Sequence, residues 1–280
     1  MSNSKDYKKN ATLKKKRSYT VVKSNVLVQQ SRFHLTTHEQ KIVLYLVSKI
    51  KPEDSKLMLY DFSIVEFCKV CGIDHESGAN YKYIKDTLKV IADKSIWVQL
   101  DSGMETVLRW IEKPYIDPMS GKVQIKLDEL MTPFLLQLKK HYTQYSLHYV
   151  LPMKSQYSIR MYELLKSYEY AGGCTLDIPE LKKILDAEKY QRHADFKVNV
   201  LDIAMREING NTDIVATYEL EKEGRKFAKI TFTIESVRDH MALLEVGNNV
   251  DQKMEDKKKR GRKKKAEEPD GQISINERER

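Results

Sequence analysis

The chain has 280 residues, of which 41% are hydrophobic, and carries a formal net charge of +9 at pH 7. It is therefore long enough to form two domains with buried cores. Its three cysteines cannot build a disulfide framework, and no apolar run is long enough for a membrane span or a secretory signal. These features exclude an integral membrane protein and a disulfide-stabilised secreted domain, and we expect a cytoplasmic protein.

The positive charge lies at the two ends of the chain. Residues 1–23 carry eight Lys or Arg against one acidic residue, and residues 237–280 carry twelve against ten. Residues 24–236 are consequently neutral overall. If this central part binds nucleic acid, its basic residues must gather on one side and be balanced by acidic residues elsewhere.

Residues 1–22 are rich in lysine and have little to bury, so we expect a basic flexible arm. Thr36 and Glu39 then have the spacing of a capping box, in which each side chain accepts a hydrogen bond from the backbone N–H of the other residue. The helix that begins there should bury one apolar face, formed by Ile42, Val43, Leu46, Val47 and Ile50.

A weak internal repeat relates residues 62–67 to residues 176–181, about 114 positions later. In both copies a capping residue, Ser63 or Asp177, precedes a glutamate by three positions. This pattern predicts reciprocal capping at the start of two helices, one in each half of the chain.

The first copy continues with a second helix from about Asn80 to Asp93. Away from its apolar face this helix carries a basic row, formed by Lys82, Lys85 and Lys89. Two alternating segments at 95–100 and 106–111 flank a turn and predict a hairpin, which we assign as the wing of this module. A third strand at 122–127 should close the module.

The second half begins with a linker, because residues 128–145 are amphipathic and predict a bridging helix. A long helix over 155–170 should end at Gly172 and Gly173. The second repeat copy then predicts a capped helix, a longer helix and a hairpin, over residues 178–185, 193–209, 214–220 and 227–234. The longer helix has a buried stripe with a spacing of four, formed by Phe196, Val200, Ala204 and Ile208.

Two copies of helix, helix, strand, turn and strand predict an α+β fold that is mostly helical, made of tandem winged-helix domains with disordered basic tails. Winged-helix domains commonly bind duplex DNA through their second helix. The predicted division is a basic arm, an N-terminal winged-helix domain that contains the linker helix, a C-terminal winged-helix domain and a polar, basic tail, over residues 1–22, 23–150, 151–236 and 237–280.

Side chains that recognise DNA should lie on the second helix of each module and at the wing tip. In the first module the lysine row Lys82, Lys85 and Lys89 suits phosphates, since lysine offers a point charge. In the second module Arg can bind guanine and Asn can bind adenine in the major groove. The candidates there are Arg192, His193, Lys197, Asn199, Arg206 and, at the wing tip, Arg225 and Lys226. The same pattern is also compatible with a solvated, charged helix surface.

Several short stretches, in order and at their spacing, make residues 21–236 resemble the initiator replication proteins of iteron-containing plasmids. They are Ser24-Asn25, Leu35-Thr36 with Glu39-Gln40-Lys41-Ile42, Thr132-Pro133 with Leu135-Leu136-Gln137-Leu138-Lys139, Tyr157–Leu165, and Glu207-Ile208-Asn209. The chain departs from this family at Val198 and Asn199, where other members often carry basic residues.

The resemblance implies two winged-helix domains with pseudo-twofold similarity, of which the C-terminal domain reads most bases. It implies that monomers bind direct repeats (iterons) in double-stranded plasmid origin DNA, distort the duplex and help to load a host replication initiator and helicase. It also implies that dimers, joined through the N-terminal domain, repress the protein's own gene and so take part in plasmid copy control.

Other functions are less compatible with the residues. Cys68 and Cys71 form a lone CxxC with His75 nearby, but a structural zinc site needs four ligands. An origin-nicking enzyme needs metal ligands beside its tyrosine, and there is no His-apolar-His pair and no nucleotide-binding loop. We therefore expect no enzyme activity, no metal and no cofactor. A winged-helix transcriptional repressor stays open as an alternative, because an initiator of this kind also represses.

Overall fold

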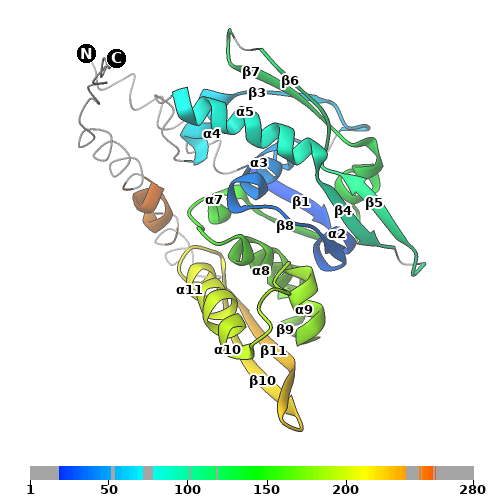
Figure 1. Ribbon diagram of the computed structural model, residues 1–280, viewed down its shortest axis with the longest axis vertical. Helices are drawn as coiled ribbons and strands as arrows, with labels where there is room; N and C mark the ends of the chain where they lie inside the picture. The colour runs from blue at the N-terminus through cyan, green and yellow to red at the C-terminus, as the bar shows by residue number, and fades with distance from the viewer. Residues whose placement is uncertain are drawn as a thin grey trace, which may run out of the picture.

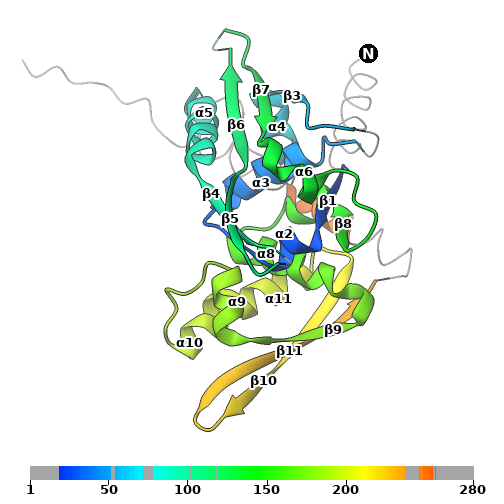
Figure 2. The same cartoon turned by 90° about the vertical axis from the view of Figure 1, so that its right-hand side faces the viewer.

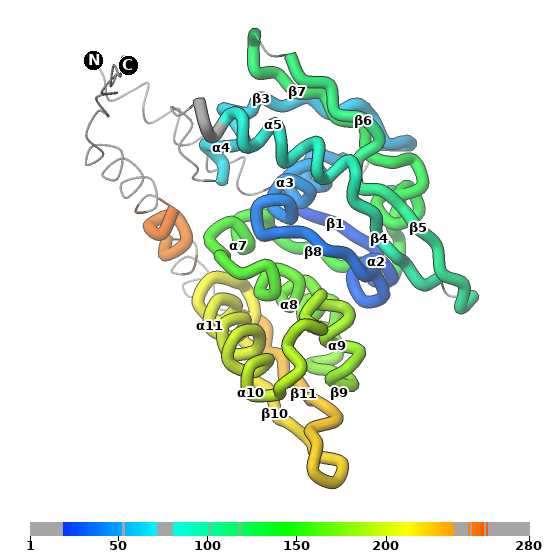
Figure 3. The backbone as a smooth tube through the Cα atoms, viewed as in Figure 1, coloured from blue at the N-terminus to red at the C-terminus, as the bar shows by residue number. Residues whose placement is uncertain are grey.

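The computed structural model describes residues 19–51, 54–71, 78–100, 102–117, 119–237, 246, 248–254 and 256. Two modules are stacked along the long axis of the molecule (Figure 1), and each is built on a three-stranded antiparallel sheet. A two-stranded sheet and a third three-stranded sheet complete the described strands. The path of the chain is shown as a tube in Figure 3, where β1, β8 and α2 lie between the two modules.

The sheet of the first module has the order β3-β7-β6. Alternation of buried and exposed residues in these strands turns one face to the core, where Tyr60, Phe62, Val123 and Ile125 are buried. The strands are β3 (Leu59–Ser63), β6 (Ile111–Ile116) and β7 (Lys122–Leu127). The helices of this module are α3 (Thr37–Val47), α4 (Ile64–Cys71) and α5 (Gly78–Asp93).

The capping box at the start of α3 is confirmed: Glu39 N–H donates to Thr36 Oγ1 at 3.4 Å, and Thr36 N–H donates to Glu39 Oε2 at 2.7 Å. Nearly the whole of this helix is buried, from Glu39 to Val47, rather than one face of it. The reason is that α3 contacts α5 of its own module and also α8 of the second module.

The two repeat copies begin their helices differently. Ser63 Oγ accepts from Glu66 N–H at 3.0 Å at the start of α4, as a helix cap does. The side chain of Asp177 makes no capping hydrogen bond, so the prediction of a second capping box is wrong. Pro179 in the first turn has no N–H to donate. Glu180 instead accepts a hydrogen bond from Arg32 at 3.1 Å.

The sheet of the second module has the order β10-β11-β9 and therefore the same connectivity as the first. In each sheet the strand before the helix pair lies at one edge, and the last strand lies in the middle. The strands are β9 (Gly173–Asp177), β10 (Ile214–Glu223) and β11 (Lys226–Ser236). The backbone of β11 approaches β9 so closely that a Cβ atom on Gly173 would lie 2.2 Å from the carbonyl oxygen of Phe232.

The helices of the second module follow the sequence prediction closely. They are α8 (Gln156–Ser167), the 3₁₀ turn η2 (Glu169–Ala171), α9 (Ile178–Ile184), α10 (His193–Phe196), the π turn η3 (Lys197–Leu201) and α11 (Asp202–Asn209). The predicted stripe of four residues is fully buried. A spacing of four would drift around a regular α-helix by about 40° at each step. The wider turn of η3 offsets this drift and keeps the stripe on the core.

The predicted wing of the first module is wrong. β4 (Ser95–Gln99) and β5 (Glu105–Arg109) form a separate sheet with β2 (Ser31–Arg32), in the order β2-β4-β5. The chain changes sheet at Trp110, so the predicted strand 106–111 is divided between β5 and β6. Trp110 and Ile111 are both buried, and this break in alternation marks the change. The wing that corresponds to β10–β11 is the β6–β7 hairpin.

The linker helix predicted over residues 128–145 is also absent. This segment forms the 3₁₀ turn η1 (Glu129–Met131), the single turn α6 (Thr132–Leu135), an irregular stretch and β8 (Tyr142–Ser146). Gln137 and His141 both have a φ of 52°, which no α-helix permits. The burial of Thr143 and Tyr145 follows the alternation of a strand.

β8 pairs with β1 (Thr20–Ser24) along its whole length. Residues 20–22, which the sequence analysis places in the flexible arm, therefore belong to the fold, and Val21 is fully buried. Two short helices complete this region, α2 (Asn25–Gln29) and α7 (Leu147–Val150). Tyr19 is described as well, and residues 1–18 of the predicted arm lie outside the described residues.

Part of the predicted disordered tail is helical. Residues 248–254 form a helix in which Val250 and Met254 are buried. Lys253 Nζ donates to Asn211 Oδ1 at 2.6 Å and to the carbonyl oxygen of Gly210 at 3.2 Å, next to the end of α11. These two apolar side chains, four residues apart, anchor the helix to the protein, although the segment is polar overall and therefore suggests disorder. The basic run at 257–265 lies outside the described residues.

A group of buried charges, which we call the buried charge seam, joins the two modules. It consists of Lys23 on β1, Tyr145 on β8, and Arg160 and Glu163 on α8, all at most 3% exposed. Glu163 forms an ion pair with Lys23 and accepts a hydrogen bond from Tyr145 Oη at 2.5 Å. Burial disfavours the Glu163 carboxylate, but Lys23 and Arg160 outweigh this effect and hold the pKa of Glu163 below its usual range.

Arg160 extends the seam to α2 and β2. Its Nη2 donates to the carbonyl oxygens of Ser31 at 3.1 Å and Val28 at 3.3 Å. Its guanidinium group lies 4.3 Å from the centre of the Phe33 ring. Because buried charges tolerate little change of geometry, these contacts fix the position of α8 against the first module.

Candidate nucleic-acid interface

The second helices of the two modules lie on one side of the molecule. Figure 2 shows α5 above and α10 below along the same side, with α11 nearer the centre of the view. The two wings, β6–β7 and β10–β11, project at opposite ends of the long axis (Figures 1 and 2). This side therefore presents two helices and two hairpins to a single elongated partner.

Three of the predicted recognition residues point to solvent from the second module. Arg192, Asn199 and Arg206 are exposed, and successive members are seven residues apart, which places them on one side of the helix. Arg192 is 80% exposed, and its only described ion pair is a long one of 3.8 Å with Asp195. Asn199 Nδ2 donates to the carbonyl oxygen of Asp195 at 2.9 Å and keeps its amide oxygen for a further partner.

Lys197 is held in place by its neighbours. Its Nζ lies 2.8 Å from both carboxylate oxygens of Asp202, and Asp202 Oδ1 also accepts from Tyr218 Oη on β10 at 2.8 Å. We call these three residues the Asp202 clamp. The hydrogen bond from Lys197 lowers the pKa of Asp202 and raises that of Lys197, so both are charged at neutral pH. The clamp fastens the recognition helix to the wing.

His193 also connects the helix to the wing. Its ring stacks on Phe227 of β11, with centroids 4.2 Å apart and an interplanar angle of 27°. His193 Nε2 is buried and has no hydrogen-bond partner among the described residues. Burial, followed by the nearby charges of Lys182 and Lys197, lowers the pKa of His193. The imidazole is therefore neutral at pH 7, and one of its nitrogens is turned into the protein.

Arg225 and Lys226 lie at the tip of the second wing, where both side chains are exposed. Gly224 has a φ of 63°, which a tight hairpin turn requires and which side chains disfavour. The tip lies far beyond the recognition helix in Figure 1. These two cations can thus contact a backbone or a minor groove next to the groove that the helix would enter.

The lysine row of the first module lies on α5. Lys82 and Lys89 are exposed, and Lys85 is half-buried. Lys89 is 3.7 Å from Asp86, in an ion pair that is exposed on both sides. At spacings of three and four the three ammonium groups share one side of the helix. The structure therefore brings together a basic row on α5 and a mixed polar surface on α10–α11.

Sequence reasoning missed the wing tip of the first module. Asp117 accepts hydrogen bonds from Met119 N–H at 2.9 Å and from Ser120 Oγ, and these bonds lower its pKa. Tyr81 on α5 braces this turn, and its Oη lies 3.4 Å from the Asp117 carbonyl oxygen. Gly121, with a φ of 65°, completes the turn. Pro118 and Gly121 indicate a turn in the sequence, but the sequence did not show that this turn is the tip of the wing.

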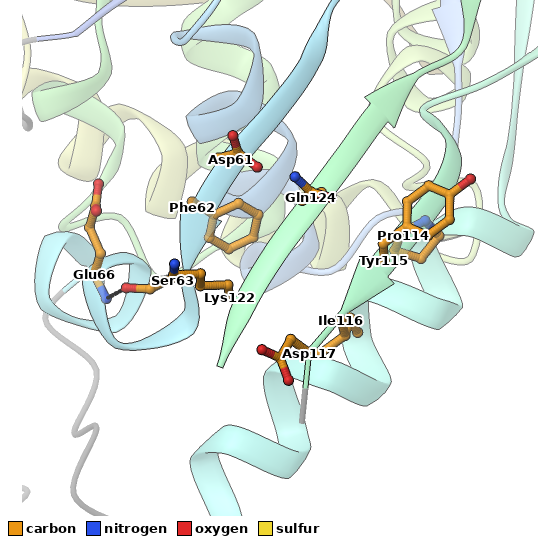
Figure 4. A pocket seen from close by; sticks show the side chains of 10 residues that line it. All are labelled: Asp61, Phe62, Ser63, Glu66, Pro114, Tyr115, Ile116, Asp117, Lys122 and Gln124. Carbon is orange, nitrogen blue, oxygen red and sulfur yellow. Dashed lines mark hydrogen bonds between the residues drawn. The ribbon is translucent and has the colours of Figure 1, made fainter. Parts of the chain in front are cut away.

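A hollow of about 960 Å³ opens on the outer face of the first sheet (Figure 4). Asp61, Gln124 and Tyr115 line it side by side from the three strands. Its other carboxylates are engaged: Glu66 accepts from Tyr45 Oη at 2.7 Å, and Asp117 belongs to the wing turn. Glu66 of α4 also lines the hollow, so one helix of the module borders it beside the sheet.

The described residues hold no group of three or more His, Cys, Asp or Glu side chains that could bind a metal ion. Cys68 and Cys71 of the lone CxxC are both buried in α4. Among the described helices, none is long and apolar enough to cross a membrane.

Comparison with known proteins shows to which family the chain is similar. The family model described as "Initiator Replication protein, WH1" matches residues 20–166, and the model "Initiator Rep protein, WH2" matches residues 177–234. A "Replication initiation protein" from Escherichia coli is 24% identical over 241 residues, which cover 82% of this chain and 73% of that protein. The "PI protein" from Escherichia coli is 28% identical over 145 residues, which cover 45% of this chain and 47% of that protein.

Proposed function

Because the chain belongs to the initiator replication protein family, with its two winged-helix domains, we propose that it initiates replication of a plasmid by binding direct repeats at the plasmid origin. The observation that carries this proposal is the presence of two recognition helices on one side of a molecule whose modules are fastened by the buried charge seam. Such a surface suits two successive grooves of one duplex.

In this proposal each module has its own task. α10–α11 enters the major groove, where Arg192, Asn199 and Arg206 can bond to base edges. The lysine row on α5 binds phosphates and supplies affinity that falls as salt rises. The two wings contact the backbone at the ends of the site. The C-terminal domain therefore reads most of the sequence, and the N-terminal domain mainly holds the duplex.

The remaining parts of the proposal follow from the family. A monomer binds the iterons, distorts the duplex and helps to recruit the host replication initiator and helicase, while a dimer joined through the N-terminal domain represses the protein's own gene. The equal strand order of the two winged sheets supports a pseudo-twofold relation between the modules. In this scheme the protein acts in the cytoplasm, by binding alone, without enzyme activity or a cofactor.

A replication assay tests the proposal directly. A plasmid that carries only this gene and its flanking DNA should be maintained in a suitable host, and footprinting should show regular protection of repeats at helical-turn spacing. Specific binding without plasmid maintenance would leave a transcriptional repressor instead. A covalent protein–DNA adduct on supercoiled origin DNA with magnesium would identify an origin-nicking enzyme and refute the proposal.

A further inference from the structure

The centre of the recognition helix's outer surface is apolar. Val198 is 59% exposed, and Ala194, four residues earlier, is exposed on the same side. Arg192 and Asn199 lie on the same exposed side of the helix. Lys197, which sequence reasoning favoured as a base-reading residue, is bound in the Asp202 clamp. The free surface of this helix therefore offers methyl groups between polar groups.

Among the described residues, no packing contact accounts for a valine at this position. β-branched residues are weaker helix formers than alanine, and the exposed part of this side chain gains no burial from the fold. Val198 also lies in the π turn η3, a distortion that often marks functional sites in helices. The Asp202 clamp spans this turn, so the backbone that carries Val198 is fixed relative to the wing.

The major groove contains one apolar group, the C5-methyl group of thymine. We infer that Val198, assisted by Ala194, packs against the methyl group of a thymine in the target repeat and selects that base. Arg192 and Asn199 then bond to the polar edges of adjacent base pairs. This inference rests on the proposed function, because it requires α10–α11 to enter the major groove.

Exchange of thymine for uracil tests the contact, because it removes the methyl group and leaves every hydrogen bond of the base pair. The probe is the duplex that the full chain selects from a random duplex library, with each thymine replaced in turn by deoxyuridine. With the wild-type protein, one or two replacements should weaken binding roughly fourfold, as expected for the loss of one buried methyl group. Replacements elsewhere should have no effect.

Variants identify the side chain responsible. Val198→Ala should bind the thymine and uracil duplexes equally, whereas Val198→Thr, which keeps one methyl group, should retain part of the discrimination. Val215→Ala is the matched control, because Val215 is a partly exposed valine on β10, away from the recognition helix. It should discriminate as the wild type does. Unchanged thermal melting of all three variants would show that they are folded.

The outcomes separate the two claims. If no sequence is selected from the library, the proposed function fails. If a sequence is selected but Val198→Ala still prefers thymine, or the wild type is indifferent to every replacement, the inference is overturned and the proposed function stands. A loss of affinity in Val198→Ala that is equal on both duplexes, with the preference for thymine unchanged, also overturns it.

Discussion

Replacement of Glu163 with glutamine tests the buried charge seam that joins the two modules. The wild-type carboxylate is buried and offsets the positive charges of both Lys23 and Arg160. The amide of Glu163→Gln has a similar size but no charge, so two buried cations would lose their counter-charge. Tyr145 Oη can still donate to the amide oxygen, so the loss is mainly electrostatic.

Removal of one partner from a buried ion pair typically costs about 3–5 kcal/mol, because the remaining charge stays in a medium of low polarity. We therefore expect Glu163→Gln to lower the unfolding free energy at pH 7 by about 3–5 kcal/mol, and the melting temperature by on the order of 10 °C. Urea unfolding, followed by circular dichroism, measures the free energy, and differential scanning calorimetry measures the melting temperature.

The pH dependence gives the sign of the effect. The folded pKa of Glu163 lies below its unfolded value of 4.5, so its contribution is fully present above pH 4.5 and is lost as the pH falls through the folded pKa. The difference between the wild type and Glu163→Gln should therefore shrink as the medium becomes acidic. A difference that stays constant down to acidic pH would mean that the carboxylate does not act through its charge.

Two further variants complete this test. Glu129→Gln removes a carboxylate that is 73% exposed and paired with Lys126, and it should leave stability almost unchanged. Adding Lys23→Met to Glu163→Gln removes one uncompensated cation and should recover part of the lost stability. A cost below about 1 kcal/mol for Glu163→Gln alone would refute the reasoning.

Three other predictions concern the DNA-binding surface. Arg192→Ala should weaken binding to the selected repeat by about 1–3 kcal/mol but hardly change binding to random duplex. Lys82→Ala should weaken binding to both duplexes equally and reduce the slope of log affinity against log salt concentration by about one. Titrations at several salt concentrations measure both effects. Asp202→Asn should free Lys197 and remove a negative charge, so binding to random duplex should increase and the preference for the repeat should fall; an unchanged preference would remove the clamp from the recognition scheme. The pKa of His193 measured by NMR should lie below 6.5. The unfolding free energy should decrease as the pH falls from 6.5 through this lowered pKa, because the unfolded chain then binds a proton that the folded chain does not. His193→Phe, which keeps the stacking on Phe227, should abolish this pH dependence.

Local features of the fold were predictable from the sequence. The capping box at Thr36, the helix from Gly78 to Asp93 and the hairpin around Gly224 each depend on residues close together in the chain. For these elements the hydrophobic period and the turn residues agree with the final packing. The exposed positions of Arg192 and Asn199 followed from the same reasoning.

Pairing between distant segments was not predictable in the same way. The alternation at 106–111 is compatible with one strand, and only the tertiary partners of β5 and β6 show that two sheets share it. The sequence predicts a helix where β8 lies. Its partner strand, β1, lies about 120 residues earlier in the chain, so no local pattern indicated the pairing. Period alone does not identify the partner of a strand.

The state of Lys197 depends on a local distortion of the helix. Lys197 and Asp202 are five residues apart, and in a regular α-helix such side chains lie about 140° apart around the axis. The π turn η3 brings them together, so the clamp forms only because this turn is widened. The one sign of this extra residue in the sequence was the spacing of four in the buried stripe, which a regular α-helix would not keep on one face.

The buried charge seam also determines which separations of two DNA half-sites the molecule can accept in the proposed function. Two DNA-binding modules joined by a flexible linker would accept half-sites at many separations, at an entropic cost that grows slowly with distance. Two modules held at a fixed angle accept one separation, because inserting five base pairs between the half-sites rotates the second half-site by about half a turn and out of reach. In the proposed function the buried charge seam therefore sets the separation and the helical phase of the two half-sites, although its residues do not contact the DNA.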